Sequence, residues 1–460
     1  MDNNVQNDVD KLREELQDGS FGEEAIETND DSVDENVISD FLSKFGSSDD
    51  TPLKAHDWKA YIPSTIIDNP KFFGPLFGIF RPETESFYVF DAKRFENDKY
   101  LIGFIDNGSY LSAKCFNDFI KEEKCLLIGQ NFDGRFEITF KQIKSGCSVS
   151  KFSSLDDTKN KNDIYRGIHI RVKPYDTITR LFSRNTGLLE SGEMLEKCAV
   201  LVGCGSVGSF VAMELARSGV GKFVLCDTDT LEIHNICRHQ CGFSDLGRYK
   251  VDAVKDKILD INPNAEIITY RSIIQRVPED ELMPMLGRNT IIIGGGDNRG
   301  SADWACKLAI RTDSTFVSSC CWTRAFAGEI FYWTSGCGLS CYTCALGGLI
   351  DNDRPESHAN YFGTDEEMNN LSFEPGIATD IDFVTIIAVK LALDLLNRDN
   401  SNYTPRVINY LKQYTWICNT NSTKIGGERA GIFTHPLQIT NCLKVNRDCN
   451  CPYCGDTPRL

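Results

Sequence analysis

The chain lacks any apolar run approaching the roughly 20 residues of a membrane-spanning helix. Its first ten residues are acidic, unlike the basic start of a secretory leader. Basic residues are too few to balance acidic ones, since 49 Lys and Arg face 66 Asp and Glu for a net charge of −17. An acidic surface repels nucleic acid. We therefore expect a cytoplasmic protein whose main partner is neither a membrane nor a nucleic acid.

Histidine is scarce, with six in the chain, but cysteine is not. The 19 cysteines are too sparse in 460 residues for a disulfide scaffold. In a reducing compartment, close cysteine pairs become candidate metal ligands. Cys341-Tyr-Thr-Cys344 and Cys451-Pro-Tyr-Cys454 are two such pairs, and four thiolates in two knuckles form tetrahedral zinc sites. No histidine adjoins them, so we predict structural Zn²⁺, with Cys449 as an alternative to Cys451.

The N-terminal part differs in composition from the rest. Residues 1–52 hold 16 Asp and Glu against 3 Lys and Arg, a net charge of −13, and few aromatic residues. Such a segment buries too little apolar area to offset the entropy of ordering, so we predict a disordered acidic tail. Within it, residues 37–45 place apolar side chains on one helical face. They are either a helix that docks a partner such as a conjugating enzyme, or incidental apolar residues in a solvated tail.

Residues 53–175 alternate short aromatic-rich runs with turn residues, which predicts an N-terminal α+β domain. Its strand candidates are residues 87–90, 101–105, 125–128 and 168–172. The segment shows no catalytic constellation, so the sequence leaves its role open.

From residue 176 to 460 the pattern changes to apolar strand, glycine turn and helix. This alternation predicts an α/β fold, a Rossmann-like and mostly parallel sheet with helices on both faces. The buried strands are expected at 198–202, 222–226 and 290–293, and the helices at 209–218, 250–259 and 377–396.

A glycine motif joins the first of these strands to the helix that follows. In Gly203-Cys-Gly205-Ser-Val-Gly208 the glycines allow a tight turn and close backbone approach, and the helix N-terminus offers N–H groups to phosphate. Asp227 lies 19 residues beyond Gly208, at the end of the next strand, where a carboxylate can bind ribose. The motif predicts a nucleotide but does not distinguish NAD from ATP.

The residues after Asp227 favour ATP. A 22-residue stretch holds Asp229, Asn235, Arg238 and Lys250. A diphosphate bound through backbone amides does not require these groups, whereas a triphosphate does, because cations stabilise charge on a pyrophosphate leaving group. A solvated loop with incidental charges is the alternative.

Two further polar residues follow the strand at 290–293. Asp297 and Asn298 come after three glycines, at the sheet edge where open α/β folds bind ligands. An aspartate there can carry Mg²⁺ and an asparagine can contact the nucleotide, although Asp-Asn after glycines is also a common turn.

Together these motifs resemble the ThiF-like ubiquitin-activating family, over about residues 181–460. The resemblance is carried by the order of Ser-Arg184-Asn, the glycine motif, Asp227-Thr-Asp229, Asn235-Ile-Cys-Arg238, Gly247-Arg-Tyr-Lys250 and Asp260-Ile-Asn-Pro263. It implies an ATP-dependent adenylyltransferase, a transferase that activates the C-terminal carboxylate of a ubiquitin-like or sulfur-carrier-like protein with a glycine tail.

The resemblance also implies site roles. It assigns ribose to Asp227, the phosphates to Asn235, Arg238 and Lys250, and magnesium to Asp297. Arg184 corresponds to the family's arginine that reaches the other subunit's ATP site, which implies a homodimer. Many members of the family bind structural zinc through paired cysteines.

The sequence departs from family members that form a thioester. These usually place a nucleophilic cysteine after the first zinc pair, but residues 347–371 contain none. The nearest candidates, each more readily explained as structural, are Cys320, Cys321, Cys418 and Cys442. Transfer to a conjugating enzyme, a sulfur donor or an amide nitrogen therefore stays open.

Three rival functions also stay open. One is a non-catalytic scaffold like the inactive half of a ubiquitin-activating heterodimer, although such halves commonly lose the nucleotide-contacting residues that this chain retains. Another is adenylation of a peptide rather than a protein. The third is a nicotinamide oxidoreductase, which would not need Arg238 and Lys250.

Overall fold

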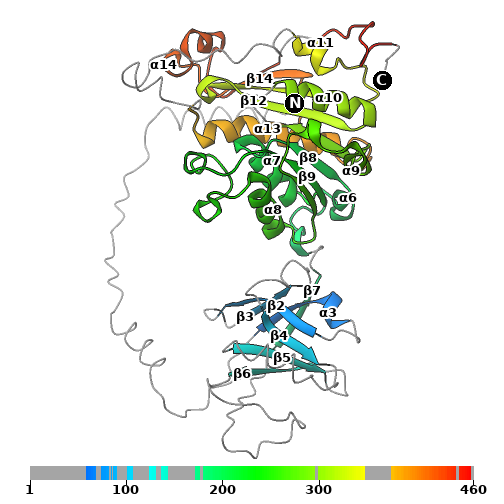
Figure 1. Ribbon diagram of the computed structural model, residues 1–460, viewed down its shortest axis with the longest axis vertical. Helices are drawn as coiled ribbons and strands as arrows, with labels where there is room; N and C mark the ends of the chain where they lie inside the picture. The colour runs from blue at the N-terminus through cyan, green and yellow to red at the C-terminus, as the bar shows by residue number, and fades with distance from the viewer. Residues whose placement is uncertain are drawn as a thin grey trace, which may run out of the picture. The chain divides into compact units, whose positions relative to one another are not determined.

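The described residues of the computed structural model contain two β-sheets, one before and one after residue 180 of the sequence (Figure 1). The structure describes residues 59–68, 74–81, 84, 86–90, 101–106, 124–130, 136–142, 171–176, 180–295, 299–347, 375–441 and 445–456. The predicted acidic tail and its 37–45 segment lie outside these residues.

The first sheet has seven strands in the order β6-β5-β4-β2-β3-β1-β7. Alternation across the pleat puts Ala60, Ile62 and Val89 in the buried core, while Tyr61 and Tyr88 stack with ring centroids 4.8 Å apart. The predicted runs at 87–90, 101–105 and 125–128 all form strands here. The strands are β1 (Lys59–Pro63), β2 (Gly74–Arg81), β3 (Ser86–Phe90), β4 (Leu101–Asp106), β5 (Lys124–Gln130), β6 (Phe136–Gln142) and β7 (Arg171–Tyr175), and the helix α3 (Ser64–Ile67) follows β1.

The second sheet has eight strands in the order β10-β9-β8-β11-β12-β13-β14-β15. The pairs from β10 to β12 are parallel, and those from β12 to β15 are antiparallel. This confirms the Rossmann-like, mostly parallel sheet, while its antiparallel half was not predicted. The strands are β8 (Cys198–Val202), β9 (Lys222–Cys226), β10 (Glu266–Tyr270), β11 (Thr290–Gly294), β12 (Thr315–Cys321), β13 (Ala327–Trp333), β14 (Tyr414–Cys418) and β15 (Gln438–Asn441).

Helices cover both faces of this sheet (Figure 1). Alternate residues of each buried strand point to opposite faces, so Leu201 joins a core with α7 and α13, whereas Val200 and Val202 join a core with α10 and α11. The helices are α6 (Ser191–Leu195), α7 (Ser206–Arg217), α8 (Lys250–Ile261), α9 (Glu279–Leu282), α10 (Arg299–Thr312), α11 (Tyr342–Leu346), α13 (Ala378–Leu396) and α14 (Thr423–Gly426). In the described part of the chain, no helix has the length and apolarity needed to cross a membrane.

Candidate nucleotide and metal sites

The glycine motif lies where two halves of the parallel sheet diverge. β8 is paired with β9 on one side and β11 on the other, so the loops after these strands leave the same edge. The Gly295 N–H donates to the Val202 carbonyl at 3.1 Å, which ties the end of β11 to the end of β8. Open α/β sheets bind ligands at this type of switch point.

Two glycines of the motif are required by geometry. Gly203 has a φ of +98°, in the left-handed region that favours glycine. A Cβ on Gly208 would lie 1.9 Å from the Gly203 carbonyl oxygen, so α7 approaches the loop more closely than a side chain allows. A Cβ on Gly205 would meet no heavy atom within 4 Å. The loop therefore brings the N-terminal N–H groups of α7 to the sheet edge, where they can face a phosphate.

Asp227 is fixed by two backbone amides. The Cys204 N–H donates to its Oδ2 at 2.7 Å, and the Asp229 N–H donates to its Oδ1 at 2.8 Å. Hydrogen bonds of this kind orient a carboxylate without neutralising it. Asp227 therefore links the glycine loop to the loop after β9, and each of its oxygens retains a lone pair for a ribose hydroxyl.

Lys250 and Asp229 form the charged part of the same edge. The Lys250 Nζ lies 2.9 Å from the Asp229 Oδ2, and the Lys250 side chain is 12% exposed against 62% for Asp229. The hydrogen bond from Lys250 holds the pKa of Asp229 below its usual value. Lys250 thus pairs with an exposed carboxylate, and solvent screens the attraction between the two charges. An incoming phosphate can therefore compete with Asp229 for the Lys250 ammonium.

A pocket of about 470 Å³ opens beside this pair. Its lining includes three predicted site residues, Asp229, Asn235 and Lys250, together with Tyr249. The Asn235 Oδ1 accepts from the Glu232 N–H at 3.0 Å, which closes the short turn that carries it. The pocket is open and polar, as a site for a charged ligand must be.

The remaining predicted residues are not part of this pocket lining. The nearest Arg238 guanidinium nitrogen lies 3.8 Å from the position of a Cβ on Gly376, just before α13. Arg184 is exposed and makes no hydrogen bond or ion pair with another described residue. Asp297 and Asn298 lie outside the described residues, so their roles stay predictions.

Sequence reasoning missed His239. This ring is 7% exposed, its Nε2 lies 2.7 Å from the Cys204 carbonyl oxygen, and its Nδ1 accepts from the Cys241 N–H at 3.0 Å. An acceptor Nδ1 places the ring proton on Nε2, so Nε2 is the donor to Cys204. Burial lowers the pKa of His239 and keeps the ring neutral. A contact between residues 35 positions apart leaves no periodic signal in the sequence.

The two cysteine pairs meet in one cluster. Cys341 and Cys451 have Sγ atoms 3.7 Å apart, as do Cys344 and Cys454, and all four Sγ atoms lie within 4.8 Å of one another. A zinc ion with four bonds of 2.3 Å to sulfur requires S–S separations of about 3.8 Å. The four thiols therefore fit Zn²⁺. Cys449 is exposed and outside the cluster, so the fourth position belongs to Cys451.

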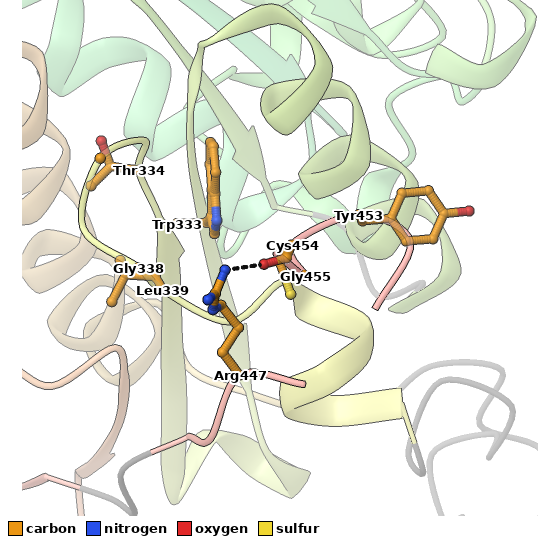
Figure 2. A pocket seen from close by; sticks show the side chains of 9 residues that line it. Trp333, Thr334, Gly338, Leu339, Arg447, Tyr453, Cys454 and Gly455 are labelled. Atoms are coloured by element: carbon orange, nitrogen blue, oxygen red, sulfur yellow. Dashed lines mark hydrogen bonds between the residues drawn. The ribbon is translucent and has the colours of Figure 1, made fainter. Parts of the chain in front are cut away.

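The second knuckle is held by a tight turn. The Gly455 N–H donates to the Cys451 carbonyl at 2.9 Å, and Figure 2 shows the Arg447 guanidinium directed at the Cys454 carbonyl, with an Nη1–O distance of 2.8 Å. Burial opposes ionisation of Cys451, but hydrogen bonds from the backbone of Cys454 and Tyr453 lower the pKa of this thiol to about 7. The backbone of the knuckle thus favours the thiolate of Cys451, whereas burial raises the pKa of the Cys341 and Cys344 thiols.

The candidate thioester cysteines that the structure describes differ in their burial. Cys320 and Cys321 are half-buried at the end of β12. Cys418 is fully buried, and desolvation raises the pKa of its thiol. Cys442 and residues 348–371 lie outside the described part of the chain.

Comparison with known proteins places this site in a family. The ThiF family model matches residues 184–424, more than half of the chain, and the chain belongs to the ThiF family. Three curated proteins are similar to it. A tRNA threonylcarbamoyladenosine dehydratase of Bacillus subtilis (strain 168) is 45% identical over 20% of this chain and 37% of that protein. A ubiquitin-like modifier-activating enzyme 5 of Bombyx mori is 30% identical over 41% of this chain and 49% of that protein. The sulfur carrier protein ThiS adenylyltransferase of Escherichia coli (strain K12) is 26% identical over 37% of this chain and 65% of that protein.

Each of these matches covers less than two thirds of the relative. Among solved structures, E. coli MccB with ATP is 17% identical and has a TM-score of 0.41, over 58% of this chain and 68% of that one.

Proposed function

We propose that the ThiF domain uses Mg-ATP to adenylate the C-terminal carboxylate of a ubiquitin-like or sulfur-carrier-like protein. Family membership supports adenylation, since relatives are named ubiquitin-like modifier-activating enzyme 5 and sulfur carrier protein ThiS adenylyltransferase. The observation that carries the proposal is that Asp227 joins the glycine loop to the loop after β9, whose residues Asp229 and Asn235 line one polar pocket with Lys250.

In the proposed reaction a substrate carboxylate oxygen attacks the α-phosphorus of ATP. The new bond is O–Pα, the bond from Pα to the bridging oxygen breaks, and that electron pair leaves with pyrophosphate. No general base is needed, because a C-terminal carboxyl is ionised at pH 7.

The chain's own residues bind and orient the nucleotide. Asp227 accepts hydrogen bonds from ribose, and the start of α7 faces the α-phosphate. Lys250 and Arg238, with the partner subunit's Arg184, stabilise the charge that grows on pyrophosphate. Asn235, Asp229 and Asn298 complete the polar contacts, and Asp297 would hold Mg²⁺, which shields the phosphate charge.

The four-cysteine cluster has a separate, structural role in this proposal. With Cys341, Cys344, Cys451 and Cys454 as ligands, Zn²⁺ has no open coordination position for a substrate. The ion would fix the turn of residues 451–455 to α11. The cysteine cluster takes no part in the later reaction of the adenylate. We propose that residues 37–45 dock the conjugating enzyme that receives the activated substrate.

Exchange of pyrophosphate into ATP tests the proposal. The substrates are purified ubiquitin-like proteins that end in glycine, and the matched controls are the same proteins with a C-terminal amide. Exchange with the free carboxylate but not with the amide is the expected result. Failure of the protein to bind Mg-ATP in calorimetry, with binding of NADH instead, would overturn it in favour of an oxidoreductase.

A second candidate is chemistry on a tRNA-borne threonylcarbamoyl group. The relative that is 45% identical, named tRNA threonylcarbamoyladenosine dehydratase, favours it. The net charge of −17 opposes it, because tRNA is a polyanion. Stimulation of ATP consumption by tRNA, and not by any glycine-ended protein, would decide for this candidate.

A further inference from the structure

Residues 239–241 make three hydrogen bonds, of which one reaches the glycine loop, one reaches α7 and one lies within the segment itself. Besides the two bonds of the His239 ring, the Gln240 N–H donates to the Oγ of buried Ser209 at 3.4 Å. His239 directly follows Arg238 in the chain. The segment that carries this arginine is therefore attached to the loop that faces a phosphate.

Cys204 is held at both of its backbone polar groups. Its N–H donates to Asp227, and its carbonyl accepts from the His239 ring. One bond holds the peptide unit before Cys204 and the other holds the unit after it, so rotation of either unit would leave a buried polar group unpaired. His239 thus fixes the glycine loop at the Cys204 carbonyl, while Asp227 fixes it at the Cys204 N–H.

We propose that His239 is a positioning residue that sets the separation between Arg238 and the glycine loop, so that one ATP molecule meets both. This inference rests on the proposed function. The inference goes beyond the proposed function because it states that His239, a side chain that does not contact the nucleotide, sets the distance between the two parts of the triphosphate site. The ring performs this task only as the neutral Nε2–H tautomer, because only that form pairs with both the Cys204 carbonyl and the Cys241 N–H.

The role predicts a difference between two ligands. AMP contacts Asp227 and the glycine loop but lacks the β and γ phosphates that Arg238 would bind. ATP reaches both parts of the site. Loss of the His239–Cys204 hydrogen bond, the tether, therefore weakens binding of ATP. General damage to the loop weakens binding of both ligands alike.

Two substitutions separate the two hydrogen bonds of the ring. In His239→Asn the amide oxygen replaces Nδ1 and keeps the Cys241 contact, but the side chain is too short for the Cys204 carbonyl. In His239→Gln the amide nitrogen reaches the position of Nε2 and retains the Cys204 contact. His435→Asn makes the Asn change at an exposed histidine away from the site and serves as the control.

Isothermal titration with Mg-ATP and with AMP measures the effect. For His239→Asn we expect about tenfold weaker Mg-ATP binding, the scale of one lost hydrogen bond, and AMP binding within about twofold of wild type. His239→Gln and His435→Asn retain Mg-ATP binding within about threefold.

The outcomes distinguish the two proposals. If wild type binds Mg-ATP and His239→Asn binds it equally well, or loses both ligands to the same extent, the tether is wrong and the proposed function stands. If wild type binds neither nucleotide, the proposed function fails and the tether fails with it. Nitrogen chemical shifts of His239 that show the Nδ1–H tautomer would also overturn the inference, without any ligand.

Discussion

The nucleotide edge and the cysteine cluster of the ThiF domain are built in opposite ways. The proposed nucleotide edge, where the glycine loop, Asp227 and Lys250 lie, draws most of its described residues from one stretch, 198–250, and its anchors are backbone hydrogen bonds such as those to Asp227. The cysteine cluster joins two pairs 110 residues apart, and its buried thiols face mainly one another. The described anchors of the first are held by hydrogen bonds alone, whereas weak S–H donors would make the second depend on the proposed metal.

Removing one cysteine ligand of the cluster should have the largest effect on stability. Cys344→Ser should abolish binding of about one zinc per chain and lower the free energy of unfolding by several kcal/mol, since structural zinc contributes on the order of 10 kcal/mol in small zinc domains. Metal analysis and urea unfolding measure these effects. Cys449→Ser, which changes an exposed cysteine just before the second knuckle, should change neither. Absence of zinc from carefully reduced wild-type protein would contradict the assignment.

Loss of a phosphate-binding group should stop chemistry while sparing the fold. We expect Lys250→Ala, Arg238→Ala and Asp297→Ala each to reduce carrier-dependent pyrophosphate exchange about 100- to 1000-fold, because these groups act on charge that develops in the transition state. Unfolding midpoints should stay close to wild type. Lys255→Ala, a lysine on α8 outside the pocket lining, is the control. Near-normal exchange in one of the first three variants would remove that residue from the proposed role.

A single methyl group tests whether the nucleotide edge is preformed. Gly208→Ala should cost about 1–3 kcal/mol of stability or more, because its Cβ would overlap the Gly203 carbonyl. Gly205→Ala adds the same atom where nothing lies within 4 Å and should change stability by less than about 0.5 kcal/mol. Equal unfolding midpoints in urea for the two variants would show that the loop adapts.

Mixing two inactive variants tests the site across subunits. If the partner subunit's Arg184 serves each ATP, Arg184→Ala and Asp297→Ala chains are inactive alone. After random exchange about half of the dimers are mixed, and each has one intact site, so about a quarter of wild-type exchange should return. A tag on one chain verifies mixing. Mixed dimers without activity would place Arg184 in its own subunit's site or in none.

The smallest expected effect is a pH dependence of stability. Burial lowers the pKa of His239 in the folded state below 6.5, so the unfolded chain binds more protons as the pH falls below 6.5. The stability due to the neutral ring is present above pH 6.5 and is lost as the pH falls toward the lowered value. Groups near the ring include Lys250, Asp227 and Asp245, so the difference between wild type and His239→Gln isolates the effect. A difference that does not change between pH 7 and 5.5 would contradict it.

The sequence predicted what local pattern determines. Unbroken apolar runs located β8, β9 and β11, because strands buried on both faces need no polar alternation. The helix α7 begins at Ser206, three residues before its predicted start, since the glycine turn passes directly into the first helical turn. Spacing identified the four cysteines, but only packing excluded Cys449.

The antiparallel strands and the His239 contacts were not predictable in this way. β13 and β14 are joined through 80 residues of intervening chain that includes α11 and α13, so no hairpin signal links them. In the sequence, nothing distinguishes His239 from the other polar residues of its loop. Its proposed role depends on the backbone carbonyl of Cys204, which lies 35 residues earlier in the chain and 2.7 Å from the ring in the fold.

The strict alternation of β8 has a consequence for cooperativity. Leu201 packs into the core that α7 and α13 close, and its neighbours Val200 and Val202 pack into the core that also holds Cys341 and Cys451. One strand therefore belongs to both layers, and neither layer can melt without exposing the other. In hydrogen exchange, the amides of β8 should open only with the whole ThiF domain, so that nucleotide and metal each slow the same opening event.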